Sequence, residues 1–228
     1  MYRSATVAGS GDFISITMAR STKQEAIETR DRILDAAQTV FHARGVSRTS
    51  LADVAHAAHV TRGAIYWHFA NKADLFNAMC ERVRLPMEAM VDETRGPADE
   101  APLQQLRSAC LFAIGQIVRE PRTRQVFDIL HHKCEFVDVD DAIWHRQHES
   151  FVKGMRNIER LLMLARDAGQ LSADLDIHLA AVSLHAMLDG LINNWLFSPQ
   201  SFALGAELER LLDACFEMIH SAPSLRLR

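Results

Sequence analysis

Two neighbouring stretches of the 228-residue chain, HHKCEF and WHRQHE, collect side chains of the kinds that bind metals or attack substrates. Imidazole, thiol and carboxylate groups like these could hold zinc or form a Cys–His catalytic pair. The spacing argues against both, because the stretches lack the His-Glu-x-x-His pattern that places two ligands and a base on one helix face. We therefore expect no catalytic residue, no metal site and no cofactor, and interpret these residues as structural: His131, His132, Cys134, Glu135, His145, His148 and Glu149.

The stretch VTRGAIYWHFANK (Val60–Lys72) carries side chains suited to contact with a nucleic acid. On a short helix, Ile65 and Phe69 lie four residues apart and face the core together, so Arg62 and Tyr66 point outward. An arginine near a helix start can pair with both acceptor atoms of a guanine, and a glycine and an alanine beside it let the backbone approach the bases. We predict that this surface reads the major groove of double-stranded DNA.

Phosphate contacts are expected around these base contacts. Tyr66, His68 and Lys72 carry hydrogen-bond donors, and the helix start near Ser50 offers backbone amides. Trp67 has two interpretations: its indole packs in a seam between this segment and the rest of the chain, or its edge lies at the groove. The complete predicted DNA-binding set is Thr49, Ser50, Thr61, Arg62, Gly63, Ala64, Tyr66, Trp67, His68 and Lys72.

Helices must position these side chains, and the sequence predicts three of them in this region. The first, from about Lys23 to Arg44, is indicated by an apolar stripe that contains Ile33, Ala37, Val40 and Phe41. Thr49 or Ser50 can cap a second short helix, and Thr61 can cap a third of about eight residues. Two short helices joined by a tight turn have the layout of a helix-turn-helix.

The composition supports an all-α fold for the whole chain. Hydrophobic residues make up 48%, glycines number 10 and prolines 6, and no apolar run reaches the roughly 18 residues of a membrane span. The net charge is −4, but residues 1–80 hold 9 Lys and Arg against 7 Asp and Glu, whereas residues 81–228 hold 16 against 22. A DNA-facing surface therefore belongs to the first 80 residues.

The four cysteines lack the spacing of a metal site or a disulfide framework. This pattern is typical of reduced, mostly buried thiols. We expect a cytoplasmic protein with no membrane association, since the first twenty residues also lack the layout of a secretory signal.

Turn-forming residues divide the larger C-terminal part into further helices, with breaks at 95–102, at Pro121, at 168–174 and at 197–201. The last two helices, about Ile177–Phe197 and Ala203–His220, are candidates for a four-helix dimer interface, in which Gly190 permits close approach. A monomer would expose the apolar face of the final helix, so we predict a homodimer. That face consists of Leu204, Leu208, Leu211, Leu212, Cys215, Phe216 and Ile219.

Polar residues on apolar faces predict a binding cavity in the same part. Asp189 lies in the apolar run AVSLHAMLDGLINNWLF, where an unpaired buried carboxylate is costly, so it must reach solvent, a partner or a bound molecule. His185, Leu188 and Asp189 share one helix face, and Phe127 and His131 share another. An apolar cavity with a few polar groups is typical of a small-molecule site. The alternative is a hydrogen-bonded core histidine and an acid in a subunit seam.

The segment TRDRILDAAQTVFHARGVSRTSLADVAHAAHVTRGAIYWHFANKADLF (Thr29–Phe76) resembles the DNA-binding domain of the TetR family. Together with MARSTKQEAIETR and HHKCEF, it is similar to the AcrR-like members, the local repressors of multidrug (RND-type) efflux pumps. The resemblance extends from Met18 to the C-terminal SAPSLRLR and implies a dimer that binds a palindromic operator through its third helix. His59 departs from the subgroup, which usually has glycine in this turn, because a positive φ is uncommon for other residues.

The resemblance also implies a ligand site for a hydrophobic small-molecule inducer. The positions that match the drug pocket of AcrR-like repressors are Val83, Arg124, Phe127, His131, Phe151, His185, Leu188 and Asp189.

Three parts of the chain are expected. Residues 1–17 are a disordered extension or the product of an upstream start codon, 18–72 a DNA-binding domain, and 73–228 a helical ligand-binding and dimerisation domain. The alternatives to an efflux-pump repressor are a regulator of the same type acting on a metabolic or stress operon, an interaction scaffold and a metal-binding helical enzyme.

Overall fold

The computed structural model describes the backbone of residues 11–93, 101–135 and 142–227, and the side chains of residues 23–84, 101–135 and 142–227. These residues form nine α-helices, one short 3-10 helix and an isolated bridge, which confirms the predicted all-α class. The helices are α1 (Gly11–Arg44), α2 (Leu51–Ala57), α3 (Arg62–His68), α4 (Lys72–Glu93), α5 (Pro102–Arg119), α6 (Pro121–His132), α7 (Ala142–Asp167), α8 (Ile177–Phe197) and α9 (Leu204–Ser221), followed by η1 (Pro223–Leu225).

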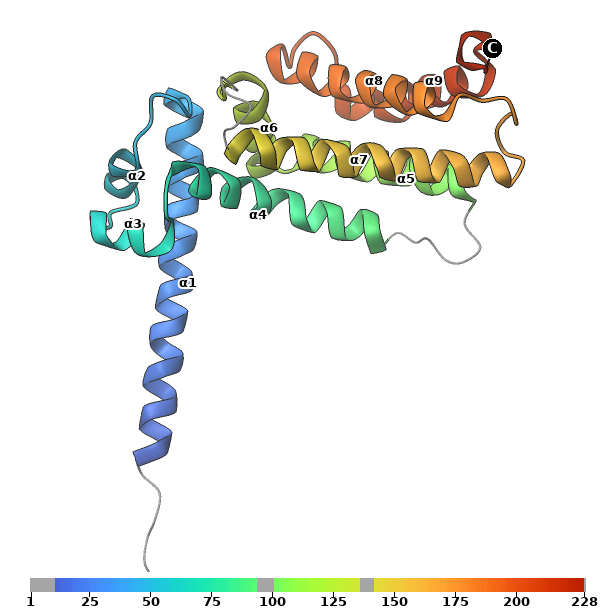
Figure 1. Ribbon diagram of the computed structural model, residues 1–228. Coiled ribbons are helices and arrows are strands. Elements are labelled where there is room, and N and C mark those ends of the chain that lie inside the picture. Colours follow the sequence, from blue (N-terminus) through green and yellow to red (C-terminus); the bar gives the residue numbers. More distant parts are fainter. Residues whose placement is uncertain (1–10, 94–100, 136–141, 228) are drawn as a thin grey trace, which may run out of the picture.

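The short helices α2 and α3 lie beside the long α1, at one end of the molecule (Figure 1). The same α1 also packs against α4 and α6. In the larger part, α5 and α7 lie side by side, with α4 on one side of them and the α8–α9 pair on the other (Figure 1). Because α4 contacts both α1 and α7, it links the N-terminal helices to the rest of the molecule.

The first hydrophobic core joins α1–α4 to α6 and the start of α7. The aromatic rings of Phe41 and Phe76 meet edge to face, with their centroids 5.9 Å apart. Val126 and Ile129 of α6 are buried in the same cluster. The N-terminal helices therefore have no separate core of their own, and their position depends on α4 and α6.

The second core buries one face of α9, which corrects our argument for a dimer. Because α9 packs against α5 and α8, most of the face that we expected to be exposed in a monomer is at most 6% exposed: Leu204, Leu208, Leu212, Cys215 and Ile219. Leu211 and Phe216 are half-buried against the same core. The exposed large apolar side chains of this pair of helices lie on α8 instead, at Leu179, Val182, Met187 and Phe197.

Most helix boundaries agree with the sequence-based expectations. The end of α1 at Arg44 and the bounds of α8 were predicted, and Gly45 takes the left-handed backbone (φ 81°) that ends a helix. The start of α1 was predicted incorrectly. Residues 11–17, which we expected to belong to the disordered extension, are helical. No glycine or proline interrupts residues 12–44, so nothing in the sequence ends the helix earlier. Residues 1–10 lie outside the described residues.

Candidate functional site

Ser50 caps α2 through a reciprocal pair of hydrogen bonds. Its Oγ accepts from the backbone N–H of Asp53 (3.2 Å), and the Asp53 carboxylate accepts from the backbone N–H of Ser50 (2.8 Å). The Ser50 hydroxyl also donates to the Asp53 carboxylate, and this bond, followed by the one from the Ser50 N–H, lowers the pKa of Asp53. Thr49 is only 2% exposed and donates its hydroxyl to the carbonyl of Gly45 (2.8 Å). Its predicted DNA contact is therefore wrong, since the side chain is used inside the protein.

The turn between α2 and α3 contains the predicted departure at His59. This residue has a φ of 54°, the one positive φ of a residue other than glycine in the described chain. The left-handed backbone lets the N–H groups of His59 and Val60 return to the carbonyls of His56 and Ala55 (3.1 and 3.0 Å). The turn thus keeps its geometry without glycine, at a cost in backbone strain.

The exposed face of α3 agrees with the prediction made from its spacing. Ile65 and Phe69 are fully buried, whereas Arg62 is exposed and Tyr66 and Trp67 are 53% and 74% exposed. Trp67 therefore does not pack in a seam, and its ring contacts His68 edge-on at 4.6 Å. Thr61 caps the helix by accepting from the N–H of Ala64 (3.1 Å), next to the exposed Gly63.

Two of the expected phosphate donors are constrained by the protein itself. Burial, with a smaller effect from Arg30, lowers the pKa of His68, which keeps the imidazole neutral near neutral pH. Lys72 donates its ammonium group to the carbonyls of Val46 (2.9 Å) and Ser47 (3.1 Å). Lys72 therefore holds the segment between α1 and α2, and because an ammonium group has three donors, its phosphate contact stays a prediction.

A cavity of about 500 Å³ lies between α4, α6, α7 and α8. Six of the predicted ligand residues line it: Val83, Phe127, His131, Phe151, His185 and Asp189. Aromatic rings form part of the wall, because Phe127 stacks on His131 (6.4 Å) and Phe151 meets His185 edge-on (5.0 Å). The remaining lining residues were missed: Cys80, Arg84, Val126, Leu130, Gln147 and Ser150. Gln147 lies three residues before Ser150 and four before Phe151, a helical spacing that could have identified Gln147.

Two predicted ligand residues do not line this cavity. The Arg124 guanidinium lies over the ring of Trp195, 4.9 Å from its centroid, and lines a separate cavity of about 510 Å³ with His42 and Asp128. Leu188 is half-buried against the second core. Asp189, the next residue, lines the cavity instead, so the predicted shared face of Leu188 and Asp189 is not observed.

Two of the predicted ligand residues, His131 and Asp189, form a polar pair in the cavity. The His131 Nε2 lies 3.8 Å from an oxygen of Asp189, whose side chain is 54% exposed. Burial lowers the pKa of His131, and the Asp189 carboxylate opposes this effect. Asp189 thus reaches solvent and a histidine, which explains how the apolar α8 tolerates a carboxylate.

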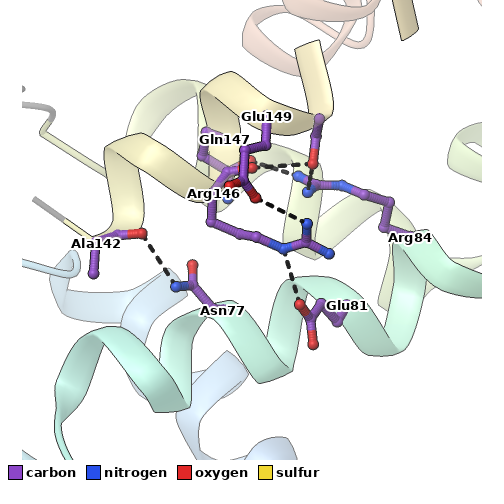
Figure 2. A network of polar contacts seen from close by, with 8 residues as sticks. Asn77, Glu81, Arg84, Ala142, Arg146, Gln147 and Glu149 are labelled. Atoms are coloured by element: carbon purple, nitrogen blue, oxygen red, sulfur yellow. Dashed lines mark hydrogen bonds and ion pairs between the residues drawn. The ribbon is translucent and has the colours of Figure 1, made fainter. Parts of the chain in front are cut away.

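A polar network ties α4 to α7 along one wall of the cavity (Figure 2). Arg84 of α4 donates to the Oε1 of Gln147 (2.5 Å) and to the hydroxyl of Ser150, both in α7. On the same two helices, Arg146 pairs with Glu81 at 2.9 Å. Asn77 donates to the carbonyl of Ala142 (3.3 Å). Of these residues, Arg84, Gln147 and Ser150 line the cavity.

The reactive side chains of HHKCEF and WHRQHE have separate surroundings. His132 pairs with Asp128 (2.9 Å), and His148 stacks on Trp144 with centroids 4.7 Å apart. Within the described residues, no group of three or more His, Cys, Asp or Glu side chains is arranged to hold a metal. In the same residues, no helix has the length and apolar character needed to cross a membrane.

Comparison with protein families gives two matches that divide the chain. Residues 33–79 match the family model described as bacterial regulatory proteins, tetR family. Residues 101–221 match the model of the C-terminal region of MAATS-type transcriptional repressors. The first match contains the helix-turn-helix, and the second begins just before α5 and ends with α9.

Individual relatives cover almost the whole chain. The transcriptional regulator TtgR of Pseudomonas putida is 40% identical over 209 residues, which is 92% of this chain and 100% of that protein. The structure of NalD, the secondary repressor of the MexAB-OprM multidrug efflux pump of Pseudomonas aeruginosa, superimposes with a TM-score of 0.73 at 36% identity, over 85% of this chain and 96% of that one. A complex of SmeT, from Stenotrophomonas maltophilia, with triclosan has a TM-score of 0.75 at 31% identity, over 83% and 90%.

Proposed function

Since the chain belongs to the TetR family of transcriptional regulators, we propose that it is a repressor that binds a palindromic operator as a dimer and leaves it when a hydrophobic small molecule binds. The exposed face of α3 supports this proposal most. Ile65 and Phe69 hold the helix to the core, while Arg62, Tyr66 and Trp67 remain open to solvent. An exposed arginine and two exposed aromatic rings on one short helix form a surface suited to a DNA groove.

The contacts on DNA follow from this arrangement. Arg62, the first residue of α3, pairs with a guanine in the major groove, and Gly63 leaves room for the approach of the backbone. The Tyr66 hydroxyl and the Trp67 indole N–H donate to the sugar–phosphate backbone on either side. Ser50 places the first turn of α2 against a phosphate. Base contacts supply the sequence preference, and phosphate contacts fix the register.

The proposed dimer forms through the outer face of α8. Leu179 and Val182 are 42% and 41% exposed, and Ala186 and Gly190 continue the same face at helical spacing. A Cβ added at Gly190 would meet no atom within 4 Å, so this part of the helix is open to a close partner helix. Two copies joined here would present two α3 helices to successive major grooves, about 34–36 Å apart.

The cavity between α4, α6, α7 and α8 is the proposed inducer site. Its volume of about 500 Å³ suits a small organic molecule, and SmeT, a relative of similar structure, has a solved structure in complex with triclosan. An inducer would favour a state of the dimer in which the α3 helices have the wrong separation, through its different affinity for the two states. In this account α4 transmits the change, because it lines the cavity and its first residue, Lys72, holds the segment before α2.

The operon under control is proposed to encode a multidrug efflux pump. NalD and SmeT repress such pumps in their own organisms. Residues 18–72 act as the DNA-binding domain and residues 73–228 as the ligand-binding and dimerisation domain, in the cytoplasm, where a bacterial operator lies.

Arg62 provides the direct test of the DNA-binding role. Fluorescence anisotropy with the DNA upstream of the gene should give specific binding, and Arg62→Ala should weaken it by roughly 1–3 kcal/mol relative to unrelated DNA. Arg210→Ala is the matched control, because Arg210 is a solvent-exposed arginine on α9 and its loss removes the same charge. Absence of specific binding by the wild-type protein, or equal losses in both variants, would contradict the proposal.

A further inference from the structure

A second cavity, separate from the proposed inducer site, lies where α1, α6 and the end of α8 meet. Its volume is about 510 Å³, similar to that of the inducer cavity, and the two cavities share no lining residue. Its wall consists of His42 of α1, four residues of α6, and Trp195, Leu196 and Pro199 from the end of α8 and the turn after it. Because α6 packs against both α1 and α8, the cavity adjoins the long helix that lies beside α2 and α3 (Figure 1).

Arg124 brings to this cavity a positive charge that no described carboxylate neutralises. One N–H of its Nη2 donates to the carbonyl of Val118 (2.5 Å), and the guanidinium lies 4.9 Å from the ring centroid of Trp195. These two contacts fix the direction of the side chain, which is nevertheless exposed. A guanidinium has five N–H donors, so most of those of Arg124 remain available to a bound anion.

The carboxylate in the cavity wall, that of Asp128, is engaged by two histidines. Its oxygens lie 3.0 Å from the Nε2 of His42 and 2.9 Å from the Nδ1 of His132. Asp128 is one helical turn from Arg124, yet the described structure contains no ion pair between them. The histidines thus hold Asp128, and the place of a carboxylate beside Arg124 is left open.

The rest of the wall suits a flat organic molecule. Pro121, Leu196 and Pro199 contribute apolar surface, and the guanidinium of Arg124 covers the ring of Trp195. An arginine binds a carboxylate through two parallel N–H···O bonds, and the face of its guanidinium stacks on aromatic rings. We propose that this cavity is a second binding site, that it takes a small aromatic carboxylate, and that Arg124 pairs with the acid group.

A ligand in this site contacts both parts of the chain. His42 belongs to α1 and lies within residues 33–79, which match the DNA-binding family model, whereas Trp195 belongs to α8. A bound acid therefore bridges α1 and α8 directly, and this bridge includes no residue of α4 or of the inducer cavity.

Two probes of similar shape test the proposal: 4-nitrobenzoate, which carries a carboxylate, and 4-nitroacetophenone, in which a neutral methyl ketone replaces it. Calorimetric titration without DNA should show that the wild-type protein binds the acid more tightly. Arg124→Gln should weaken binding of the acid roughly tenfold and leave binding of the ketone nearly unchanged, because hydrogen bonds to a charged group are lost. Arg124→Lys keeps the charge without the paired N–H groups, so its affinity for the acid should fall between the two.

Arg210→Gln is the matched control, because it removes an exposed arginine of α9 and should leave binding of the acid unchanged. Equal affinities of the wild type and Arg124→Gln for the acid, equal losses in Arg124→Gln and Arg210→Gln, or no binding of the acid would overturn the proposal. Because the titration contains no DNA, a failure of operator binding would be detected separately and would leave this result intact.

The fluorescence of Trp195 locates the bound acid without a change at Arg124. The chain has three tryptophans, so a protein with both Trp67→Phe and Trp144→Phe retains Trp195 alone. A nitroaromatic ring quenches tryptophan fluorescence on contact, and 4-nitrobenzoate should therefore quench Trp195 over the same concentration range in which calorimetry detects binding. Binding of the acid without quenching would place it at another site and contradict the proposal.

Discussion

His59 is strained where a glycine would not be. Its φ of 54° lies in the left-handed region, which costs most residues about 1–2 kcal/mol, whereas glycine loses about 0.5–1 kcal/mol through its greater freedom in the unfolded chain. His59→Gly should therefore raise the free energy of unfolding by about 0.5–1 kcal/mol, measured by urea denaturation. His56→Gly is the control and should lower the free energy of unfolding by about 0.3–0.5 kcal/mol, because residue 56 is helical and glycine is the poorer helix former. Equal losses in the two variants would contradict the account.

His131 should make stability depend on pH. Its folded pKa is lowered, chiefly by burial, so the unfolded chain binds the proton more readily. The contribution to stability is present above the ordinary pKa of 6.5 and is lost as the pH falls through the folded value. His131→Gln should therefore lose less unfolding free energy than the wild type between about pH 7 and about pH 5.

A control separates this effect from other titrations. His145→Gln changes an exposed position of α7 and should show the same loss of unfolding free energy as the wild type over this pH range. The pKa of His68 is also lowered, so part of the loss of unfolding free energy at low pH should remain in every variant. Identical pH dependence in the wild type and His131→Gln would show that His131 does not titrate as described.

At the scale of helices, Lys72 joins the start of α4 to the segment between α1 and α2. Its ammonium group donates to two carbonyls, those of Val46 and Ser47. Lys72→Met should lower the free energy of unfolding by about 1–2 kcal/mol, since charged hydrogen bonds to a partly buried carbonyl are lost. The exposed Lys23→Met should have little effect. If Lys72→Met weakened DNA binding without loss of stability, a phosphate contact would be the better explanation.

Helix boundaries were more predictable than the neighbours of each helix. The bounds of α8 follow from Gly, Pro and Ser residues on either side, and the inward pair Ile65 and Phe69 follows from helical spacing alone. The apolar face of α9 was also recognised, but spacing cannot tell whether such a face meets the same chain or a second copy. The partners of Lys72 lie 25 and 26 residues earlier, so only the folded chain reveals them.

In the cavity too, helical spacing identified some of the residues, but packing determined which way their side chains point. The pairing of His131 with Asp189 joins residues of α6 and α8 that the sequence singled out as polar positions on apolar faces. Arg124 was placed in the cavity through the family resemblance, but its guanidinium turns to Trp195 instead. The direction of a long side chain depends on local packing and on competing partners, which the sequence alone does not supply.

At the scale of the whole molecule, the account requires two copies of the chain on one face of the DNA. In the proposed dimer, the exposed residues of α8, including Val182 and the open position at Gly190, would supply the surface for pairing. The exposed α3 helices of the two copies would then contact half-sites related by twofold symmetry. Val182→Arg should leave each chain folded, because the side chain faces solvent. It should prevent two copies from pairing through α8, and without this pairing the dimer cannot contact both half-sites.

Footprinting of the DNA upstream of the gene tests this claim most directly. The wild-type protein should protect a palindromic site whose half-sites are separated by a whole helical turn, about 10 base pairs. Val182→Arg should lose this protection at the same protein concentration. Protection of a single half-site, protection without sequence preference, or none at all would contradict a dimeric operator-binding repressor.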